Sequence, residues 1–187
     1  MTRSRTALST LAALLLAGCA SDEDREVVFP RGTHEVCTRP APRPAIFRGG
    51  PLLLSHQFRA LGPGRAVETA RLAGGIMLKL HHEACERQSQ AFRFYLPKGQ
   101  AAPGNPAATY ALAARFMRGL AAPGPDGDAL RELAQPLAAA AAKGGAAPPL
   151  AGRIALGEFQ ELLVNVSPGA ETSAYGPVLV VTYRLKV

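Results

Sequence analysis

Tryptophan, long apolar runs and most aromatic side chains are missing from this chain of 187 residues. Its longest apolar run, residues 7–16, is about half of the ~20 residues that a helix needs to cross a bilayer, which excludes a multi-span membrane protein. The 11 aromatic residues are all Phe or Tyr, so the core must be built mainly from Leu and Val. A hydrophobic share of 48% nevertheless excludes a fully disordered chain, and the length fits one domain.

The motifs of several enzyme classes are absent as well. There is no G-x-S-x-G turn for a nucleophilic serine, no C-x-x-C pair, and no glycine-rich loop followed by Lys and Ser or Thr for phosphate. All Asp residues lie in two short stretches, 22–24 and 126–128, so a Ser-His-Asp triad lacks a suitable third member. The Asp-Gly-Asp sequence at 126–128 lacks the other ligands of a Ca²⁺ loop, and a turn with a helix cap explains it.

The first 19 residues have the pattern of an export signal. Arg3 and Arg5 precede the apolar run, and the tetrapeptide Leu-Ala-Gly-Cys follows at 16–19. In this order the segment resembles the lipobox signal of bacterial lipoproteins. The resemblance implies a signal peptide over residues 1–18 and acyl chains such as palmitate on Cys19, which would hold the protein to a membrane through about 0.8 kcal/mol per buried methylene. The alternative is an ordinary secretory signal with an incidental Cys.

The residue after the lipobox bears on the compartment. In the sorting pattern of such lipoproteins, an Asp directly after the lipidated Cys retains the protein at the inner membrane. This chain has Ala20 there, which predicts an outer-membrane lipid anchor facing the periplasm. Removal of residues 1–18 lowers the formal charge from +7 to +5. The basic residues are mostly Arg, typical of a codon bias, and are scattered singly along the sequence, so no nucleic-acid partner is expected.

Two cysteines remain once Cys19 is assigned to the lipid. Only one pairing, Cys37 with Cys85, is open to them, and a disulfide is the default in an oxidising periplasm. Closing a loop of about 49 residues would stabilise the fold by up to roughly 4 kcal/mol on chain-entropy grounds. A reactive thiol or a metal site lacks supporting ligands, and we expect neither a metal nor a cofactor.

Composition divides the mature chain into two parts. Residues 19–45 are polar, acidic near their start and rich in Pro from 38 to 44, which is typical of a tether. The segment between Cys19 and Cys37 has a flexible reach of roughly 20 to 25 Å, which would keep the domain close to the membrane. Residues 46–187 are predicted to form a single periplasmic domain.

Alternating apolar residues predict strands over residues 51–97. Glycine-containing turns at 62–64 and 74–75 separate the runs, so a four-strand antiparallel meander follows. The first run is expected to place four side chains on one face: Leu52, Leu54, His56 and Phe58. A single helix over 65–90 is the alternative, although two adjacent Gly in its middle would each cost about 1 kcal/mol.

Two helices are predicted between this meander and the C-terminal strands. The first has Asn105 as its N-cap, Pro106 at its first helical position and an apolar stripe at four-residue spacing. The second has Asp128 as its cap and ends near 143–145, and Pro136 must kink or divide it.

The C-terminus returns to strand, with alternating apolar residues over 162–166 and 179–185. The predicted fold class is therefore α+β. It consists of an antiparallel β-sheet, a meander plus a C-terminal hairpin, with two helices inserted between strands and packed on one face.

One group of residues has side chains suited to chemistry: His81, His82 and Glu83, with Cys85 next to them and with His56 and His34 elsewhere in the chain. Adjacent residues of a strand point to opposite faces, so His81 and His82 cannot both bind one metal. A metal site would need His56 and His82 to meet across the sheet with a third ligand such as Glu83. Ordinary surface or half-buried histidines are the simpler interpretation, and no catalytic residue is assigned.

Carboxylate pairs and modification sites add little. Glu158 and Glu161 are the nearest candidates for a catalytic pair of carboxylates, and they are expected on a solvated edge. The tripeptide at 165–167 matches a glycosylation acceptor but lies in a predicted strand, and it is discounted.

The expectation from sequence is a membrane-anchored bacterial lipoprotein that is not an enzyme. It would act as a binding or accessory component of an envelope assembly, with an envelope protein as its partner. The first alternative is a periplasmic enzyme that uses the region of His81, His82 and Glu83. The second is an inhibitor or immunity-type lipoprotein that acts through the loop 167–177.

Overall fold

A computed structural model describes residues 37–85, 88–100, 103–169 and 174–185. All of these residues fall within the unit Thr33–Val187. The signal segment 1–18, Cys19 and residues 20–36 of the tether lie outside the described residues. In the part of the chain that is described, no helix is both long and apolar enough to cross a membrane.

The first four strands form the predicted antiparallel meander, and they are β1 (Leu53–Gly62), β2 (Arg65–Leu72), β3 (Ile76–Ala84) and β4 (Gln88–Pro97). The turn between β2 and β3 contains Gly74 and Gly75 at φ of 78° and 75°. Glycine reaches this left-handed region without steric cost, which explains why two glycines form the turn between the strands. The alternative of one helix over 65–90 is wrong.

The alternation of β1 fails near its start. The pairing of β1 with β2 shifts register between Leu53 and Ser55, which places an irregularity of the β-bulge type in the edge strand. Leu54 is 70% exposed as a result and does not share the buried side with His56. The prediction of one common face is therefore wrong at Leu54.

The helix α1 (Pro106–Leu120) begins as predicted. Asn105 is its N-cap, and the side-chain oxygen of Asn105 accepts a hydrogen bond from the amide of Ala108 at 2.8 Å. A proline occupies the first helical position, where no backbone donor is lost. The predicted stripe faces the sheet, because Phe116 packs on Phe94 of β4 with ring centroids 4.8 Å apart.

The helix α2 (Asp128–Ala142) differs from expectation at two points. Asp128 is its first residue rather than its cap, and the carboxylate pairs with Arg131 at 2.7 Å. The helix is not divided at Pro136, although this residue lacks the backbone donor that would bond the carbonyl of Glu132. The end at Lys143 is as predicted. Short 3-10 turns flank the helix, η2 (Pro125–Gly127) and η3 (Gly144–Ala146).

Three further strands complete the sheet, and they are β5 (Arg153–Ala155), β6 (Gln160–Ser167) and β7 (Tyr175–Leu185). All pairs are antiparallel, and the strand order is β1-β2-β3-β4-β7-β6-β5. β5 has no counterpart among the predicted strands, because three residues carry too little periodicity. The prediction of an α+β fold, with a meander, a C-terminal hairpin and two inserted helices, is confirmed.

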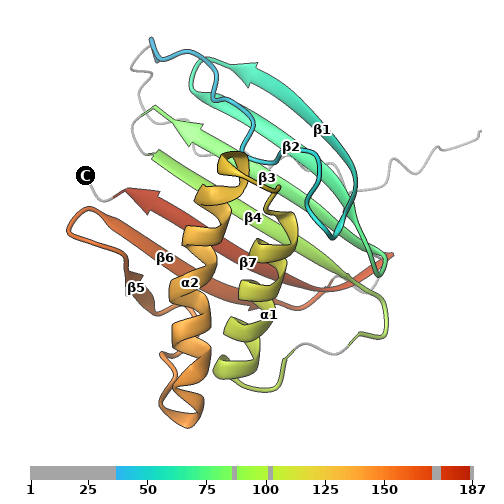
Figure 1. Cartoon of the computed structure of the whole chain (residues 1–187), viewed down its shortest axis with the longest axis vertical. Helices are drawn as coiled ribbons and strands as arrows, with labels where there is room; N and C mark the ends of the chain where they lie inside the picture. Colours follow the sequence, from blue (N-terminus) through green and yellow to red (C-terminus); the bar gives the residue numbers. More distant parts are fainter. Residues whose placement is uncertain (1–36, 86–87, 101–102, 170–173, 186–187) are drawn as a thin grey trace, which may run out of the picture. The chain divides into compact units, whose positions relative to one another are not determined.

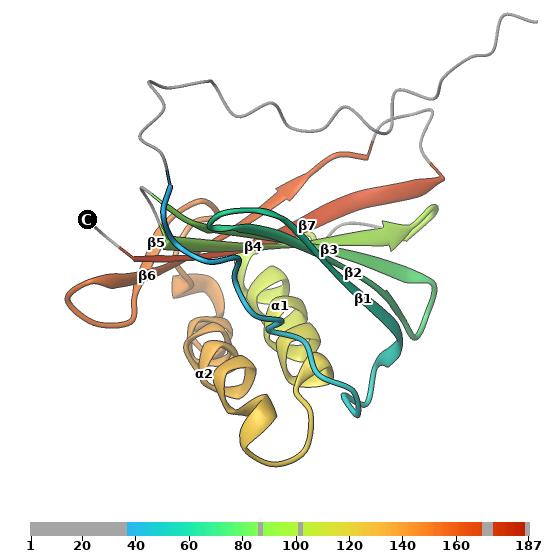
Figure 2. The ribbon, with the colours of Figure 1, turned by 90° about the horizontal axis from the view of Figure 1, so that it is seen from above.

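Both helices lie on the same side of the sheet (Figures 1 and 2). They cover a layer of fully buried side chains from neighbouring strands: Leu78, Leu80, Phe92, Phe94, Leu162, Val164, Leu179 and Val181. Burial of a side chain of this size contributes about 1.5 to 3 kcal/mol. This apolar layer is therefore what joins the helices to the sheet.

Residues 37–52, here called the strap, run along the helix side of β1 to β3 (Figure 2). Ile46 is 1% exposed and belongs to the core. The amide of Leu52 donates to the carbonyl of Gly119 at 2.9 Å, and a Cβ on Gly119 would overlap the side chain of Leu52. Among the described residues, no element covers the opposite side of the sheet, which we call the open face.

Candidate functional site

Three neighbouring strands place a carboxylate between two histidines. Glu68 of β2 is 0% exposed and accepts hydrogen bonds from Nε2 of His56 on β1 and Nε2 of His82 on β3, both at 2.6 Å. In register, His56 lies opposite Ala70 and His82 lies opposite Ala66, so each histidine is one diagonal step from Glu68. The two histidines do meet across the sheet, but on Glu68 and not on Glu83.

The same carboxylate binds the strap. The amide of Ala45 donates to Oε1 of Glu68 at 2.7 Å, and the amide of Ile46 donates to Oε2 at 3.2 Å. Since His82 also donates to Oε1 and His56 to Oε2, each oxygen accepts two hydrogen bonds. We call this set of groups the Glu68 cluster. Residues 37–45, assigned to the tether from sequence, thus include a residue that is bonded directly to the sheet.

The local sequence leaves space for this cluster. The neighbours of Glu68 on the inner side of β2 are Ala66 and Ala70, which are 1% and 3% exposed. Their single methyl groups allow the backbone of the strap to approach the strand. A buried carboxylate without partners would be costly, so the approach of two backbone amides and two imidazoles is what permits a glutamate at this position.

The hydrogen bonds keep Glu68 ionised at neutral pH. Burial raises the pKa of Glu68, but the hydrogen bonds from His82, Ala45 and His56 and the attraction of His82 together hold the pKa below its ordinary value of 4.5. An ionised carboxylate only accepts hydrogen bonds, so both imidazoles donate from Nε2. Neither Nε2 is then available as a base for another molecule, and the cluster is suited to holding the strap.

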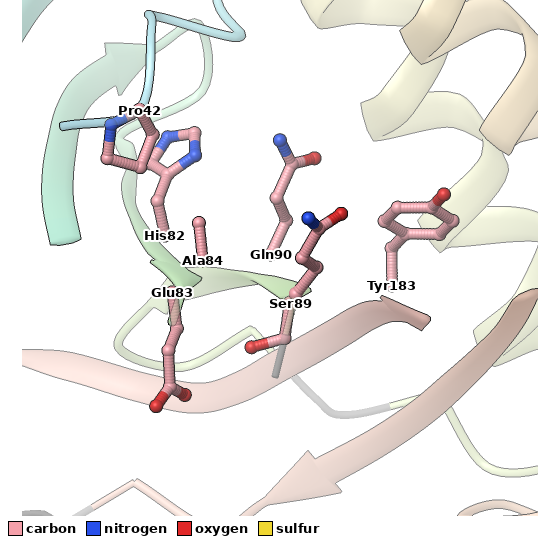
Figure 3. A pocket seen from close by; sticks show the side chains of 8 residues that line it. Pro42, His82, Glu83, Ala84, Ser89, Gln90 and Tyr183 are labelled. Atoms are coloured by element: carbon pink, nitrogen blue, oxygen red, sulfur yellow. The ribbon is translucent and has the colours of Figure 1, made fainter. Parts of the chain in front are cut away.

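A small pocket of about 140 Å³ borders His82 (Figure 3). Gln90 and Tyr183 extend to the same side of the sheet as His82, whereas Glu83 extends to the other side. His81 also lies on the open face, next to Glu83 in the alternation of β3. The prediction that His81 and His82 point to opposite faces of a strand is confirmed. The pocket is also smaller than the ~300 Å³ at which ligand sites begin.

The surroundings of His81 are basic. Burial lowers the pKa of His81, and the positive charges of Arg93 and Lys79 lower it further, with a smaller effect from His82. The imidazole of His81 thus stays neutral at neutral pH in a region of positive potential.

No metal site is found in the described ranges, where no group of three or more His, Cys, Asp or Glu residues could hold an ion. In the Glu68 cluster the imidazole nitrogens are 2.6 Å from the carboxylate oxygens. This is direct hydrogen-bond contact, and it leaves no space between them for a cation.

The disulfide between Cys37 and Cys85 is formed as predicted and joins the start of the strap to the residue after β3. Gly64, at φ of 63° in the turn between β1 and β2, lies against the bridge, and a Cβ there would overlap both sulfur atoms. The amide of Gly64 also donates to the carbonyl of Arg39 at 3.0 Å. The strap is thus attached at its start by the disulfide and further along by Glu68.

The carboxylate pair considered from sequence is separated. Glu161 on β6 is 2% exposed, so the prediction of a solvated edge is wrong for this residue. Arg184 of β7 donates to its Oε1, and Arg153 of β5 has its Nε 3.8 Å from its Oε2. Arginines on the two neighbouring strands are what compensate the buried charge. Glu158 is exposed in the turn before β6, as expected.

A larger hollow, which we call the α2 groove, has a volume of about 720 Å³. Volumes of roughly 300 to 1,000 Å³ are typical of ligand sites. Gln90 and Tyr183 border both this groove and the pocket beside His82, so the two hollows adjoin. The remaining lining comes from α2 and from the β5–β6 region: Ala129, Glu132, Leu133, Gln135, Pro136, Ala139, Ala155, Leu156 and Gln160.

Sequence reasoning missed both Glu68 and the α2 groove. A signal for Glu68 exists, because it shares one face of an alternating strand with Ala66, Ala70 and Leu72. An acidic residue at such a position must be paired if the face is buried. The α2 groove has no comparable signal in the sequence. Its lining comes from β4, α2, the β5–β6 region and β7, which only the tertiary structure brings together.

Comparisons of the chain with protein-family models, curated proteins and solved structures found no match.

Proposed function

We propose that the protein is a lipid-anchored, non-enzymatic accessory protein of the bacterial cell envelope, and that it binds an envelope protein in the α2 groove. The observation that carries the proposal is the attachment of the strap. Within residues 37–52 the chain is joined to the domain by the disulfide, by the Glu68 cluster and by the bond from Leu52 to Gly119. A lipid on Cys19 would be connected to the domain through this segment.

The position of the attachments supports an anchor at the N-terminus. The disulfide lies at the first described residue of the strap, and the Glu68 cluster follows eight residues later. Terminal segments are ordinarily poorly ordered unless contacts tie them down. The contacts of the strap would fix the point at which a membrane tether enters the domain.

The state of the histidines supports a role without catalysis. His56 and His82 direct Nε2 to Glu68, and Glu83 extends to the other side of the sheet from His82. General acid–base catalysis requires a titratable group within hydrogen-bond reach of a substrate. Of the three residues that the sequence offers for this task, His82 is engaged with Glu68, whereas His81 and Glu83 lie on the other face of β3.

The lining of the α2 groove supports a polypeptide as its ligand. Gln90, Gln135 and Gln160 bring amide groups that both donate and accept hydrogen bonds, as an extended peptide backbone requires. Leu133 and Leu156 supply apolar surface for side chains between these amides. Phe159, the neighbour of Gln160 in the turn before β6, is 62% exposed and is available as an aromatic anchor.

Substitution of the lipobox cysteine tests the anchor. We expect the wild-type protein in the outer-membrane fraction, with an intact mass that includes acyl chains, and the Cys19→Ser variant in the soluble periplasmic fraction. The matched control is the double variant Cys37→Ser/Cys85→Ser, in which Cys19 is the only cysteine and membrane attachment should persist. A wild-type protein without acyl mass would overturn the proposal.

Site-specific photocrosslinking in cells tests the groove. A photoreactive amino acid at Ala139, in the lining of the groove, should give an adduct of one defined size with an envelope protein. The control position is Ala111, which is exposed on α1. The same adduct should form from Gln135, and its yield should fall when Leu133→Asp is added. Equal adducts from Ala111 and Ala139 would contradict a role of the groove.

A further inference from the structure

The open face gathers basic side chains that are scattered in the sequence. Strand register places Gln57, Thr69, Lys79 and Arg93 in one row across β1 to β4. With the neighbouring rows included, the described residues of this face contain seven cations: Arg59, Arg65, Arg71, Lys79, Arg93, Arg153 and Arg184. The sequence-based view of isolated arginines does not hold in three dimensions.

Two of these cations face each other at the centre of the sheet. Lys79 of β3 and Arg93 of β4 are direct cross-strand partners. Like charges in this position repel each other, so the pair is unfavourable in the domain alone. Within the described ranges, Nε of Arg93 is buried and has no hydrogen-bond partner. An anion bound between the two side chains would relieve the repulsion and supply acceptors.

The carboxylates of the open face do not neutralise this centre. Glu161 is engaged by Arg184 and Arg153 at the β5 side of the sheet. Glu83 is the register partner of Arg65 at the end of the sheet, and it forms no ion pair with a described residue. Among the described carboxylates, none pairs with the five cations that remain: Arg59, Arg65, Arg71, Lys79 and Arg93.

The dimensions of the basic area fit an extended surface better than a small ligand. Arg59 is on β1 and Arg153 is on β5, at opposite edges of the sheet. Seven strands at a spacing of about 4.8 Å separate the two edges by roughly 29 Å. Tyr95 adds an aromatic ring to this face, with Nζ of Lys79 5.9 Å from its centroid. Tyrosine beside basic side chains is typical of surfaces that contact lipid headgroups.

We infer that the open face docks onto the anionic phospholipid headgroups of the membrane to which the protein is anchored, with lipid phosphate bound around Lys79 and Arg93. The inference rests on the proposed lipid anchor, because a tether of roughly 20 to 25 Å holds the domain next to the bilayer. The tether gives the open face a high effective concentration at the membrane. Binding to the headgroups then takes place even if it is too weak to recruit a free protein. The attraction decreases as salt is added.

A fluorescence experiment on the lipidated protein tests this inference. If Cys19 carries the lipid and Cys37 is bridged to Cys85, a new cysteine is the only free thiol. The Gln57→Cys variant places an environment-sensitive dye on the open face, and the Ala111→Cys variant places the same dye on α1. Both are reconstituted into vesicles of phosphatidylcholine with or without phosphatidylglycerol, containing lipids with a quenching headgroup.

We expect at least threefold quenching at position 57 in phosphatidylglycerol vesicles, little quenching at position 111, and little at either position in pure phosphatidylcholine. Adding Lys79→Glu/Arg93→Glu should abolish the quenching at position 57. The charge-matched control, Arg115→Glu/Arg118→Glu on α1, should leave it unchanged. Because Lys79 and Arg93 are half-buried, the exposed pair Arg59→Glu/Arg71→Glu serves as a second variant, and it should reduce quenching at least twofold.

Failure of the inference and failure of the anchor are distinguishable. Flotation with pure phosphatidylcholine vesicles reports the anchor alone, so flotation without quenching at position 57 overturns the docking and leaves the anchor intact. A protein that does not float with phosphatidylcholine lacks the anchor. If it then floats with phosphatidylglycerol, and this flotation is lost in Lys79→Glu/Arg93→Glu, the result still supports binding of anionic lipid by the open face. Binding of an oligonucleotide that depends on the same two residues, without lipid quenching, would overturn the assignment to lipid.

Discussion

The two faces of the sheet each contain a buried glutamate, and they compensate its charge differently. On the helix side, Glu68 receives two imidazoles and two backbone amides that packing holds in place. On the open face, Glu161 is met by Arg184 and Arg153, whose side chains are 33% and 69% exposed. Short, fixed donors surround the first carboxylate, and long, solvated cations surround the second.

This difference shows what covering a face does to its electrostatics. Beneath the strap, the negative charge of Glu68 is stabilised only by donors that the fold holds in fixed positions. The Glu68 cluster therefore contributes to the stability of the fold. On the open face the arginines that meet Glu161 are partly exposed, so water and salt screen their charges. We therefore expect perturbations of Glu68 to change stability, and perturbations of the open face to change salt dependence and binding.

The largest expected effect is that of Glu68→Ala. The substitution leaves two imidazoles and two backbone amides buried without an acceptor, and we expect a loss of about 3 to 5 kcal/mol in the free energy of unfolding. Urea denaturation followed by circular dichroism measures it. The control is Glu83→Ala on the open face of the neighbouring strand, where we expect a change within ~1 kcal/mol. Similar losses in the two variants would remove the distinction between the faces.

Removal of the disulfide should have the next largest effect. For Cys37→Ser/Cys85→Ser we expect a loss of about 2 to 4 kcal/mol, because the closed loop is long and the bridge holds the start of the strap. Combination with Glu68→Ala should cost less than the sum of the two losses, because both attachments hold the same segment. A fully additive triple variant would show that the strap is not one unit.

The pH dependence of stability should separate Glu68 on the helix side from His81 on the open face. The pKa of Glu68 is lower in the folded state than its ordinary value of 4.5, so its contribution is complete above pH 4.5 and is lost as the pH falls from there through the folded value. His81, whose pKa is lowered from 6.5, loses its contribution as the pH falls below 6.5. The Glu68→Gln variant should lack the decline below pH 4.5 and keep the one that begins near 6.5. An unchanged acid decline in Glu68→Gln would contradict this assignment.

The smallest expected effect is that of Arg184→Ala. Because Arg184 is partly solvated and Arg153 remains beside Glu161, we expect a loss of no more than about 1 kcal/mol. The difference from wild type should shrink when unfolding is measured at high salt, whereas the loss in Glu68→Ala should stay nearly constant. A loss for Arg184→Ala above that for Glu68→Ala would reverse the comparison.

Much of the fold could be predicted because local signals and tertiary packing agree. Alternation defines β2 to β4, β6 and β7, and Asn105 with Pro106 defines the start of α1. The failures have physical causes. A register shift near Leu54 interrupts the period of two, and β5 is too short to show a period at all. Asp128 resembles a cap, but it lies one residue inside α2, where it pairs with Arg131.

The candidate site was less predictable, because its partners depend on register. In the sequence, a meeting of His56 and His82 is only the condition for a metal site, and ordinary histidines are the simpler interpretation. The two histidines do meet, yet nothing local shows that Glu68 lies between them. The basic open face is hidden in the same way. Lys79 and Arg93 are far apart along the chain, and only the pairing of β3 with β4 makes them neighbours.

The disulfide has a mechanical consequence. Cys85 directly follows β3, which is paired on both sides with β2 and β4. A pull on the N-terminus therefore reaches the interior of the sheet through a covalent bond. Without the bridge, the same force would act first on the hydrogen bonds of the strap to Glu68 and then on β1, an edge strand that can be peeled away one hydrogen bond at a time.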